Sequence, residues 1–472
     1  MRYLHSHSCP SWSLCDKWVI KKLKLLKVLL SIFFLFPQFL LAQEEYSFDL
    51  SVIEKEIEKK PYSIGGYLEF RPTFYWLDDD AAFYNLEYYD RSNRSRLDEY
   101  NFELLLDVSY EKGIGSFFLR TNIDAVESEI ESDAEAKIFE GYVSLQPSPS
   151  FTADFGKIKL NWGKGYAQTF VGFAQRPKNP DDPNLLREGF IMALTDYTKS
   201  FNGPLQTATL TPVLVPVYED INEDFGNINN LNFAGKLYLL FYNTDIDFMF
   251  LTGGSKTSRF GLDFSRNITP NFEIHGEFAF INNFKKKFID SNGNLFDETF
   301  DVKSYLVGIR YLTPFDTTFI CEYYRNGTGF TADEMEDFFA FVNKGHDVFL
   351  ASGDDSLLRN AASFAEESYN TRNPMQDYLY LRISQKEPFD ILYFTPSITW
   401  IYNLNDKSYS LSPEFLYTGI TNLELRLKAG FIEGDPDTEY GEKKNDYRVE
   451  FRVRYYFDAV KVFERIKKNK NS

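Results

Sequence analysis

Apolar and polar residues alternate strictly near the end of the chain, over residues 446–457. Tyrosine, valine and phenylalanine hold every second position from Tyr447 to Phe457, and mostly arginine or glutamate stands between them. Successive side chains of an extended backbone point to opposite faces, so this run predicts a β-strand with one apolar and one charged face. A single such strand also suits a soluble sandwich, but many of them without a helical layer would indicate a barrel in lipid.

The same alternation recurs along most of the chain. It predicts strands at 64–76, 97–110, 113–124, 136–147, 151–162, 189–198, 205–218, 231–243, 245–253, 257–267, 271–283, 301–312, 316–326, 376–385, 389–403, 406–418, 422–433 and 446–457. These 18 segments favour an all-β fold, a transmembrane antiparallel β-barrel with both ends on one side of the membrane.

The connections between these segments alternate in length, as the turns and loops of such a barrel do. The expected outer connections are 77–96, 125–135, 163–188, 219–230, 254–256, 284–300, 327–375, 404–405 and 434–445. Most of them are long, whereas the expected periplasmic turns are short and rich in Gly, Pro, Asn and Asp. Segment 189–198 has the weakest alternation of apolar and polar residues. It is included because long and short connections would no longer alternate along the rest of the chain without it.

Both ends of the chain lie outside the expected barrel of residues 63–457. Residues 1–42 resemble a signal peptide, with a lysine-rich start, an apolar core over 28–41 and a cleavage residue at Ala42. That core is short for a spanning helix, so we expect cleavage, with a retained anchor as the alternative. Residues 43–62 are expected to form a periplasmic arm and residues 458–472 a basic tail.

Composition agrees with a barrel in an outer membrane. Aromatic residues make up 18% of the chain, including 47 Phe and 31 Tyr, which suits strands that end at membrane interfaces. The formal net charge of −18 makes nucleic acid an improbable partner. The expected partners are outer-membrane lipid and the barrel-assembly machinery, for which an alternating last strand ending in Phe457 is typical. Cleavage would leave Cys321 alone, without a disulfide.

The third outer connection has the most individual sequence, with two glycines near its start and three prolines further on. Glycine allows a sharp turn at the rim, and proline stiffens a segment that cannot pair as a strand. Such a segment can fold into the lumen and narrow it, or it can remain an ordered surface loop. The candidate constriction residues are Trp162, Gly163, Lys164, Gly165, Arg176, Asn179, Asp181, Asp182 and Arg187. Asp181 and Asp182 as Ca²⁺ ligands are a weaker alternative.

Residues 155–218, with Asn161-Trp-Gly-Lys-Gly, Arg176-Pro-Lys-Asn-Pro-Asp-Asp-Pro and Leu205-Gln-Thr-Ala-Thr-Leu-Thr-Pro, resemble a group of Gram-negative outer-membrane channels. This group includes the alginate exporters and related porin-like barrels. The resemblance implies a channel in the outer membrane of a Gram-negative bacterium that passes small or oligomeric solutes, with anionic solutes among the candidates. The alternative is a non-conducting structural or adhesive barrel that acts through its acidic extracellular loops.

Charged residues on the polar faces form a second candidate site. If the last strand pairs with the first, three neighbouring strands bring many basic side chains together inside the barrel. The expected pore-lining residues are Glu69, Arg71, Lys157, Lys159, Glu424, Arg426, Lys428, Arg448, Glu450, Arg452 and Arg454. Such a stripe can favour anions in a water-filled pore, or it can be an Arg/Glu ladder that stiffens the wall.

Catalysis has little support in the sequence. Beyond the expected signal peptide the histidines are His275 and His346, too few for a metal site, and no Gly-x-Ser-x-Gly motif is present. We therefore expect no enzyme activity, no cofactor and no metal. Residues 332–342, in the long connection 327–375, place apolar side chains near helical spacing. A plug, a lid and a partner surface remain open for this connection.

Overall fold

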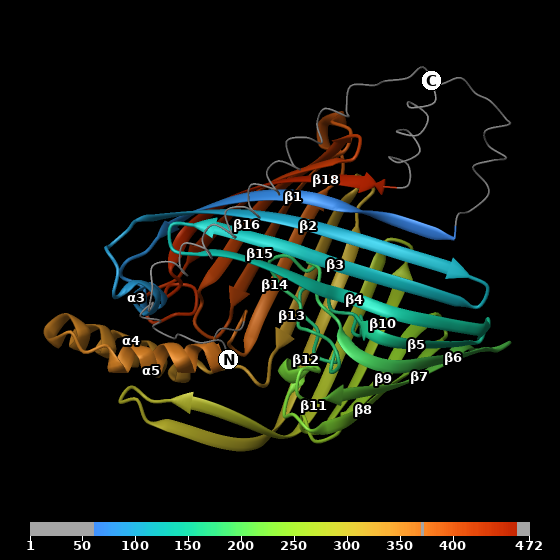
Figure 1. The fold of residues 1–472 in the computed structure, drawn as a ribbon, viewed down its shortest axis with the longest axis horizontal. Coiled ribbons are helices and arrows are strands. Elements are labelled where there is room, and N and C mark those ends of the chain that lie inside the picture. Colours follow the sequence, from blue (N-terminus) through green and yellow to red (C-terminus); the bar gives the residue numbers. More distant parts are fainter. Residues whose placement is uncertain (1–60, 370–371, 460–472) are drawn as a thin grey trace, which may run out of the picture.

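The protein, a computed structural model, is described over residues 61–369 and 372–459. These residues form one sheet of 18 antiparallel strands, each paired with its neighbours in the sequence. The first strand, β1 (Tyr62–Leu77), also pairs with the last, β18 (Asn445–Asp458), so the sheet closes into a barrel (Figure 1). The predicted 18-stranded antiparallel barrel is confirmed. The expected signal peptide and nearly all of the arm and basic tail lie outside the described residues.

The remaining strands follow one another around the barrel. They are β2 (Arg96–Lys112), β3 (Gly115–Ser128), β4 (Ser132–Ser148), β5 (Phe151–Ile158), β6 (Phe190–Ser200), β7 (Leu205–Val217), β8 (Asn230–Phe241), β9 (Thr244–Thr252), β10 (Arg259–Thr269), β11 (Phe272–Ile289), β12 (Leu295–Leu312), β13 (Thr317–Arg325), β14 (Asp377–Gln385), β15 (Phe394–Asn403), β16 (Tyr409–Ile420) and β17 (Leu423–Glu433). The weakly patterned segment 189–198 is therefore a strand, as the phase of the connections predicts.

The two faces of the strands differ as the alternation predicts. On β18, Tyr447 and Phe451 are 49% and 40% exposed on the outward face, whereas Arg452, which points inward, is 4% exposed. Large exposed apolar side chains recur on the outward face of the other strands, for example Phe155, Phe248 and Phe415. A closed ring leaves no unpaired strand edge, and its apolar outer band is the surface that a bilayer would cover.

Four predicted segments have wrong boundaries. The expected outer connections 125–135 and 284–300 are mostly strand, because β3 with β4 and β11 with β12 extend as paired ribbons past the expected ends. The aromatic pair Phe288 and Phe296 stacks across the longer ribbon at 5.5 Å between ring centroids. In contrast, β5 ends at Ile158 rather than 162, and β15 begins at Phe394 rather than 389. The left-handed backbone of Phe389 (φ 58°) prevents an earlier start.

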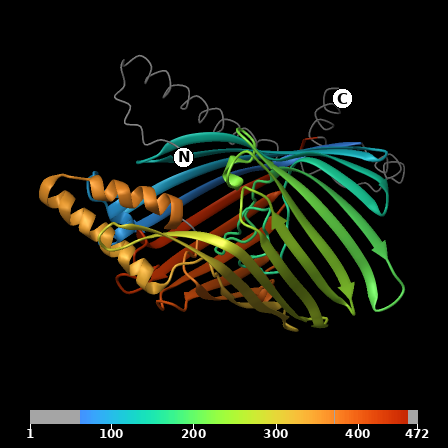
Figure 2. The same ribbon diagram turned by 90° about the horizontal axis from the view of Figure 1, so that it is seen from below.

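The connection 327–375 forms helices that pack at the rim of the barrel (Figure 2). Helix α4 (Ala332–Ser352) begins with a capping box between Thr331 and Glu334, and α5 (Ser356–Phe364) follows it. Both pack with α3 (Ala82–Tyr88) through a cluster that includes Phe338, Phe339 and Leu358. Within the described residues, no helix is both long and apolar enough to cross a membrane.

Candidate functional site

Residues 159–189, which we call the crossing segment, leave the barrel wall at the end of β5 and return to it at β6. On the far wall, Glu277 of β11 accepts hydrogen bonds from the backbone N–H groups of Gly165 and Phe170, both at 2.7 Å. Glu322 of β13 accepts from the N–H groups of Tyr166 and Ala167, the latter at 2.8 Å. The segment is therefore bound to strands far from its own ends, across the interior of the barrel.

Both glycines of the first turn are required by its close packing. Gly163 has a φ of 99°, and a Cβ atom there would lie 2.0 Å from the Oγ1 atom of Thr169. A Cβ atom on Gly165 would lie 2.2 Å from the carbonyl oxygen of Gln168. Between them, Lys164 reaches Asp247 of β9 at 2.8 Å. The sequence prediction of a sharp turn is thus correct, but the turn packs against the opposite wall.

An apolar cluster holds the next part of the crossing segment against the barrel wall. Trp162, Val171 and Phe173 pack on inward-facing side chains of β6 to β11, and the cluster excludes water from this side of the lumen. Its buried members from the wall include Met192, Leu194, Val213, Val215, Val217, Ala234, Met249, Leu251 and Ala279. The second half of β7, from Pro212 to Val217, is apolar on both faces, which is typical of a strand covered on both sides.

The second half of the crossing segment contacts the strands that carry the predicted basic stripe. Asp181 Oδ2 lies 3.2 Å from Arg448 Nη2, and Asp182 Oδ2 lies 3.4 Å from Arg452 Nη2. Lys428 Nζ donates to the carbonyl oxygen of Asp181 at 2.7 Å. Both carboxylates therefore face cationic side chains of β17 and β18, and these contacts favour ion pairs over the Ca²⁺ interpretation.

Electrostatics at these carboxylates favours the charged forms. Burial by itself would raise the pKa of Asp181, but Arg448, Lys428 and Arg372 together hold it below the ordinary value of an aspartate. Burial likewise opposes ionisation of Asp182, and Arg452 with Arg426 lowers its pKa. Both groups are negatively charged at neutral pH, so attraction holds the segment to the wall.

The register of the closed sheet places the other predicted lumen charges in pairs. Arg454 lies opposite Glu69 on β1 and opposite Glu424 on β17, and its Nη2 atom is 2.6 Å from Glu69 Oε2. Arg452 contacts Glu450 at 2.9 Å, and Arg426 contacts Glu424 at 3.1 Å. Of the remaining candidates, Arg71 is 3.9 Å from Glu69, Lys157 is paired with Glu188, and Lys159 follows the end of β5. The arginines and glutamates thus alternate as a ladder.

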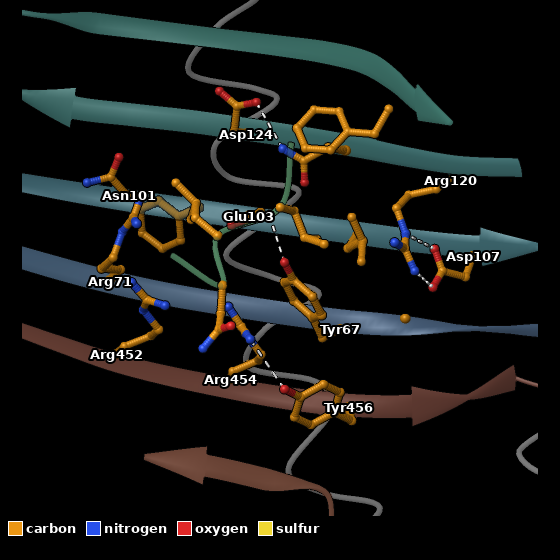
Figure 3. Close-up of a pocket in the computed structure, with 18 of the residues that line it drawn as sticks. Tyr67, Arg71, Asn101, Glu103, Asp107, Arg120, Asp124, Arg452, Arg454 and Tyr456 are labelled. Carbon is orange, nitrogen blue, oxygen red and sulfur yellow. Dashed lines mark hydrogen bonds and ion pairs between the residues drawn. The ribbon is translucent and has the colours of Figure 1, made fainter. Parts of the chain in front are cut away.

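Two cavities flank the second half of the crossing segment. The first, about 610 Å³, is near the short turns and is lined by Arg71, Arg120, Arg426, Arg452 and Arg454 together with Glu103, Asp107, Asp124 and Asp182 (Figure 3). The second, about 870 Å³, is near the long connections and is lined by Lys178, Arg187, Lys285, Lys286, Lys287 and Arg372 but by one acidic residue, Asp297. We call them the short-turn chamber and the long-loop chamber. Leu185 lines both, so it stands between them.

The predicted constriction residues lie in different parts of the lumen. Trp162, Gly163, Lys164 and Gly165 are packed at the far wall, whereas Asp181 and Asp182 meet the basic stripe. Arg187 and Asn179 line the long-loop chamber. Arg176 pairs with Asp224 and, at 3.4 Å, with Glu188. The sequence thus predicts the two aspartates and the basic stripe as two separate sites, whereas in the structure they contact each other.

Sequence reasoning missed the residues that hold the segment on the far wall, Glu277, Glu322, Asp247 and Asp263. Asp263 and Glu322 are fully buried, and His275 Nε2 lies 2.8 Å from Glu322 Oε1. A usable signal is present in the sequence, since the run Phe272–Ile281 contains Glu277, a second glutamate and one histidine, but no lysine or arginine. A buried carboxylate must be paired or hydrogen-bonded, so a run of this kind implies donors from elsewhere in the chain.

Comparisons with known proteins give matches in structure alone. No family model matches the chain. No curated protein matches its sequence. Among solved structures, Pseudomonas aeruginosa OprD matches at 11% identity and a TM-score of 0.48, covering 84% of this chain and 95% of that chain. OccK5 (OpdH) of the same organism matches at 10% and 0.47, covering 84% and 98%. OccK2 (OpdF), solved in complex with glucuronate, matches at 10% and 0.48 with the same coverage.

Proposed function

We propose that the chain is a channel of a Gram-negative outer membrane that passes small solutes, and that the crossing segment narrows its lumen. The observation that carries this proposal is the pair of chambers on either side of Leu185, one near each end of the barrel. Polar and charged side chains line both chambers, as they line water-filled pores. The apolar outward face of the strands supports a bilayer as the surroundings.

The charges of the long-loop chamber favour anionic solutes. Among the described residues, six basic residues and one acidic residue line it, in a chain whose net charge is −18. One of the six, Lys286, is paired with Glu334 at 2.6 Å. In the short-turn chamber, arginines and carboxylates are nearly balanced, so we propose that anions are selected on the long-loop side. The paired arginines argue against a continuous rail for a long polyanion, and the resemblance to alginate exporters therefore extends to the class of barrel alone.

A second candidate is a sealed structural barrel. It is favoured by the apolar cluster under the crossing segment and by the backbone hydrogen bonds to Glu277 and Glu322, which fill one side of the lumen. Single-channel conductance of the purified protein in planar bilayers separates the two candidates. Discrete conductance steps support the channel, and a folded barrel that inserts without steps supports the sealed form.

The size of Leu185 offers a sharper test of the narrowing. Leu185 is 38% exposed and lines both chambers, so Leu185→Ala should raise the unit conductance and Leu185→Trp should lower it. Leu350, 69% exposed on α4, provides a matched control, and Leu350→Ala should leave conductance at the parent value. Equal conductance in both Leu185 variants would contradict a solute path beside this residue.

A further inference from the structure

A third cavity of about 300 Å³ adjoins the long-loop chamber and has a different lining. The two share Gln168, Pro177, Phe284, Asn326 and Thr328, so they are continuous. The other polar side chains that line the smaller cavity include Lys256, Arg259, Arg176, Thr169, Gln175 and Ser304, and none of the acidic residues that the structure describes lines it. Its volume equals that of about ten water molecules in the liquid, too small for an oligomer but sufficient for a small ion with water.

Two of its cations lack a carboxylate partner. Within the part of the chain that the structure describes, neither Lys256 nor Arg259 takes part in an ion pair, and the Nε atom of Arg259 is buried without a hydrogen-bond acceptor. Lys256 Nζ instead lies 3.8 Å from the centroid of the Phe225 ring. Arg176 differs from both, because it pairs with Asp224 and Glu188. Both side chains are partly buried, and partly desolvated charge without a carboxylate partner is costly, so the pair points to an anion.

Hydrogen bonds of the preceding residue, Ser255, hold Lys256 in place. Asn232, which is fully buried, accepts from the N–H group of the adjacent Ser255 at 3.1 Å and donates to its Oγ atom at 2.8 Å. The carbonyl oxygen of Ser255 accepts from Asn227 N at 3.0 Å. Arg259 begins β10 three residues later. The two cations therefore project from a fixed turn, and such preorganisation lowers the entropic cost of binding.

The charge state of Lys256 agrees with an uncompensated site. Burial, followed by repulsion from Arg259, lowers the pKa of Lys256 to about 7, although the Asp224 carboxylate, which pairs with Arg176, acts in the opposite direction. An anion placed between the two side chains would offset that repulsion.

We propose that Lys256 and Arg259 form a binding site for a small tetrahedral oxyanion such as phosphate, either free or as the phosphoryl group of a solute. The two cations would neutralise a doubly charged group. The hydroxyl of Ser304 lines the same cavity as a hydrogen-bond donor, and so does the second N–H of the Gln175 amide, whose first N–H donates to the carbonyl oxygen of Trp162 at 3.0 Å. The place of the site beside the solute path rests on the proposed channel function, but binding itself does not require an open pore.

The test is equilibrium dialysis of the detergent-solubilised, full-length protein against radiolabelled inorganic phosphate. Saturable binding of one phosphate per chain is expected, and Lys256→Gln or Arg259→Gln should weaken it by about tenfold or more, as loss of a charge-assisted hydrogen bond does. Lys285→Gln is the matched control, because Lys285 lines the long-loop chamber but not the smaller cavity. Arg259→Lys keeps the charge and should bind more tightly than Arg259→Gln.

The results of the phosphate-binding test can be distinguished from those that test the proposed channel function. Competition by sulfate and by a phosphomonoester, but not by acetate, supports the site, and stronger competition by the phosphomonoester identifies a phosphorylated solute as the source. Absence of saturable binding in the parent protein, or equal loss in the Lys285 control, overturns it. Heat modifiability in gels confirms that each variant is a folded barrel. A sealed barrel that still binds phosphate would contradict the proposed function and leave the anion site standing.

Discussion

Buried carboxylates of the lumen have two kinds of partner. Glu277 and Glu322 accept hydrogen bonds from the backbone of the crossing segment, whereas Asp181 and Asp182 face arginines. A backbone N–H group cannot rotate away from its acceptor as a side chain can, so the far-wall contacts fix the conformation of residues 165–170. The arginine contacts are longer, at 3.2 and 3.4 Å, and depend on charge. The two ends of the segment are therefore held by interactions of different strength.

Glu277→Gln tests the backbone contacts. The NH₂ group of the glutamine would face one of the two donors, the N–H of Gly165 or that of Phe170, while the remaining oxygen accepts from the other, and loss of a charge-assisted hydrogen bond costs about 1.5–3 kcal/mol. Hydrogen–deuterium exchange of amides 165–170 should then accelerate by about one to two orders of magnitude. Glu129→Gln, at an exposed side chain of the rim, is the control and should leave these amides protected. Unchanged exchange in Glu277→Gln would show that the carboxylate does not hold the segment.

Phe451→Arg tests the assignment of the outward face. Phe451 is 40% exposed in mid-strand, and an arginine on the lipid face near mid-depth costs about 2–4 kcal/mol. The folded, heat-modifiable fraction should fall after refolding into vesicles. Asn101→Arg places the same charge on β2, where Asn101 lines the short-turn chamber, and it should fold normally. Equal yields of the two variants would mean that the outward face does not meet lipid.

At the scale of elements, alternation predicted strands well where one face is polar. It placed β1, β17 and β18 within a few residues of their observed bounds. It failed on the ribbon of β11 and β12, because three consecutive lysines over 285–287 interrupt the alternation while Phe288 and Phe296 continue the pairing. It also gave no partner for the inward apolar face of β7, which the crossing segment covers. Contacts between distant segments produce no periodic pattern in the sequence, so alternation does not predict them.

The connection between β17 and β18 should respond to pH through Glu439. Burial raises the pKa of this carboxyl group to about 7, and its Oε2 atom accepts from Tyr378 Oη at 2.5 Å and from Asn403 Nδ2 at 2.8 Å. We call the connection docked when Glu439 is buried against Tyr378 and Asn403, and undocked when these contacts are broken. In the undocked state a glutamate titrates near pH 4.3. Between about pH 4.3 and 7 the docked state therefore holds a proton that the undocked state has lost. Docking should therefore weaken as pH rises through this window and change little above it.

The measurement is hydrogen–deuterium exchange of amides 436–444 at pH 5 and pH 8, corrected for intrinsic rates. Protection should be stronger at pH 5, by a difference of the order of 3 kcal/mol. Glu439→Gln should remove most of the difference, because it keeps an acceptor without a titrating group, and the remainder is expected from Glu442, whose pKa burial also raises. Asp435→Asn, exposed in the same connection, is the control and should retain it. A pH effect of undiminished size in Glu439→Gln would exclude this residue as its main cause.

At the scale of the whole molecule, the closure of the sheet is what gives the charged residues their neighbours. Residues of β1 and β18 are almost 400 positions apart in the sequence, yet Glu69 and Arg454 form an ion pair. This neighbourhood follows from the even number of strands, and the sequence therefore predicts it. The docking of Asp181 and Asp182 on the same stripe does not follow, because no local pattern shows which way a loop folds. The stripe thus has two sets of acidic partners, one in the wall and one in the crossing segment.

These two sets predict opposite changes in ion selectivity. Asp181→Asn with Asp182→Asn should release the crossing segment from Arg448 and Arg452, leave their charges facing the lumen, and shift the reversal potential toward anions with a higher unit conductance. Arg452→Gln with Arg454→Gln should shift it toward cations, because Glu69 and Glu450 lose their partners. Glu129→Gln should change neither quantity. The reversal potential is measured in bilayer recordings under a salt gradient. If it shifts in the same direction in both double variants, or does not shift in an open and folded channel, ions do not pass beside the stripe.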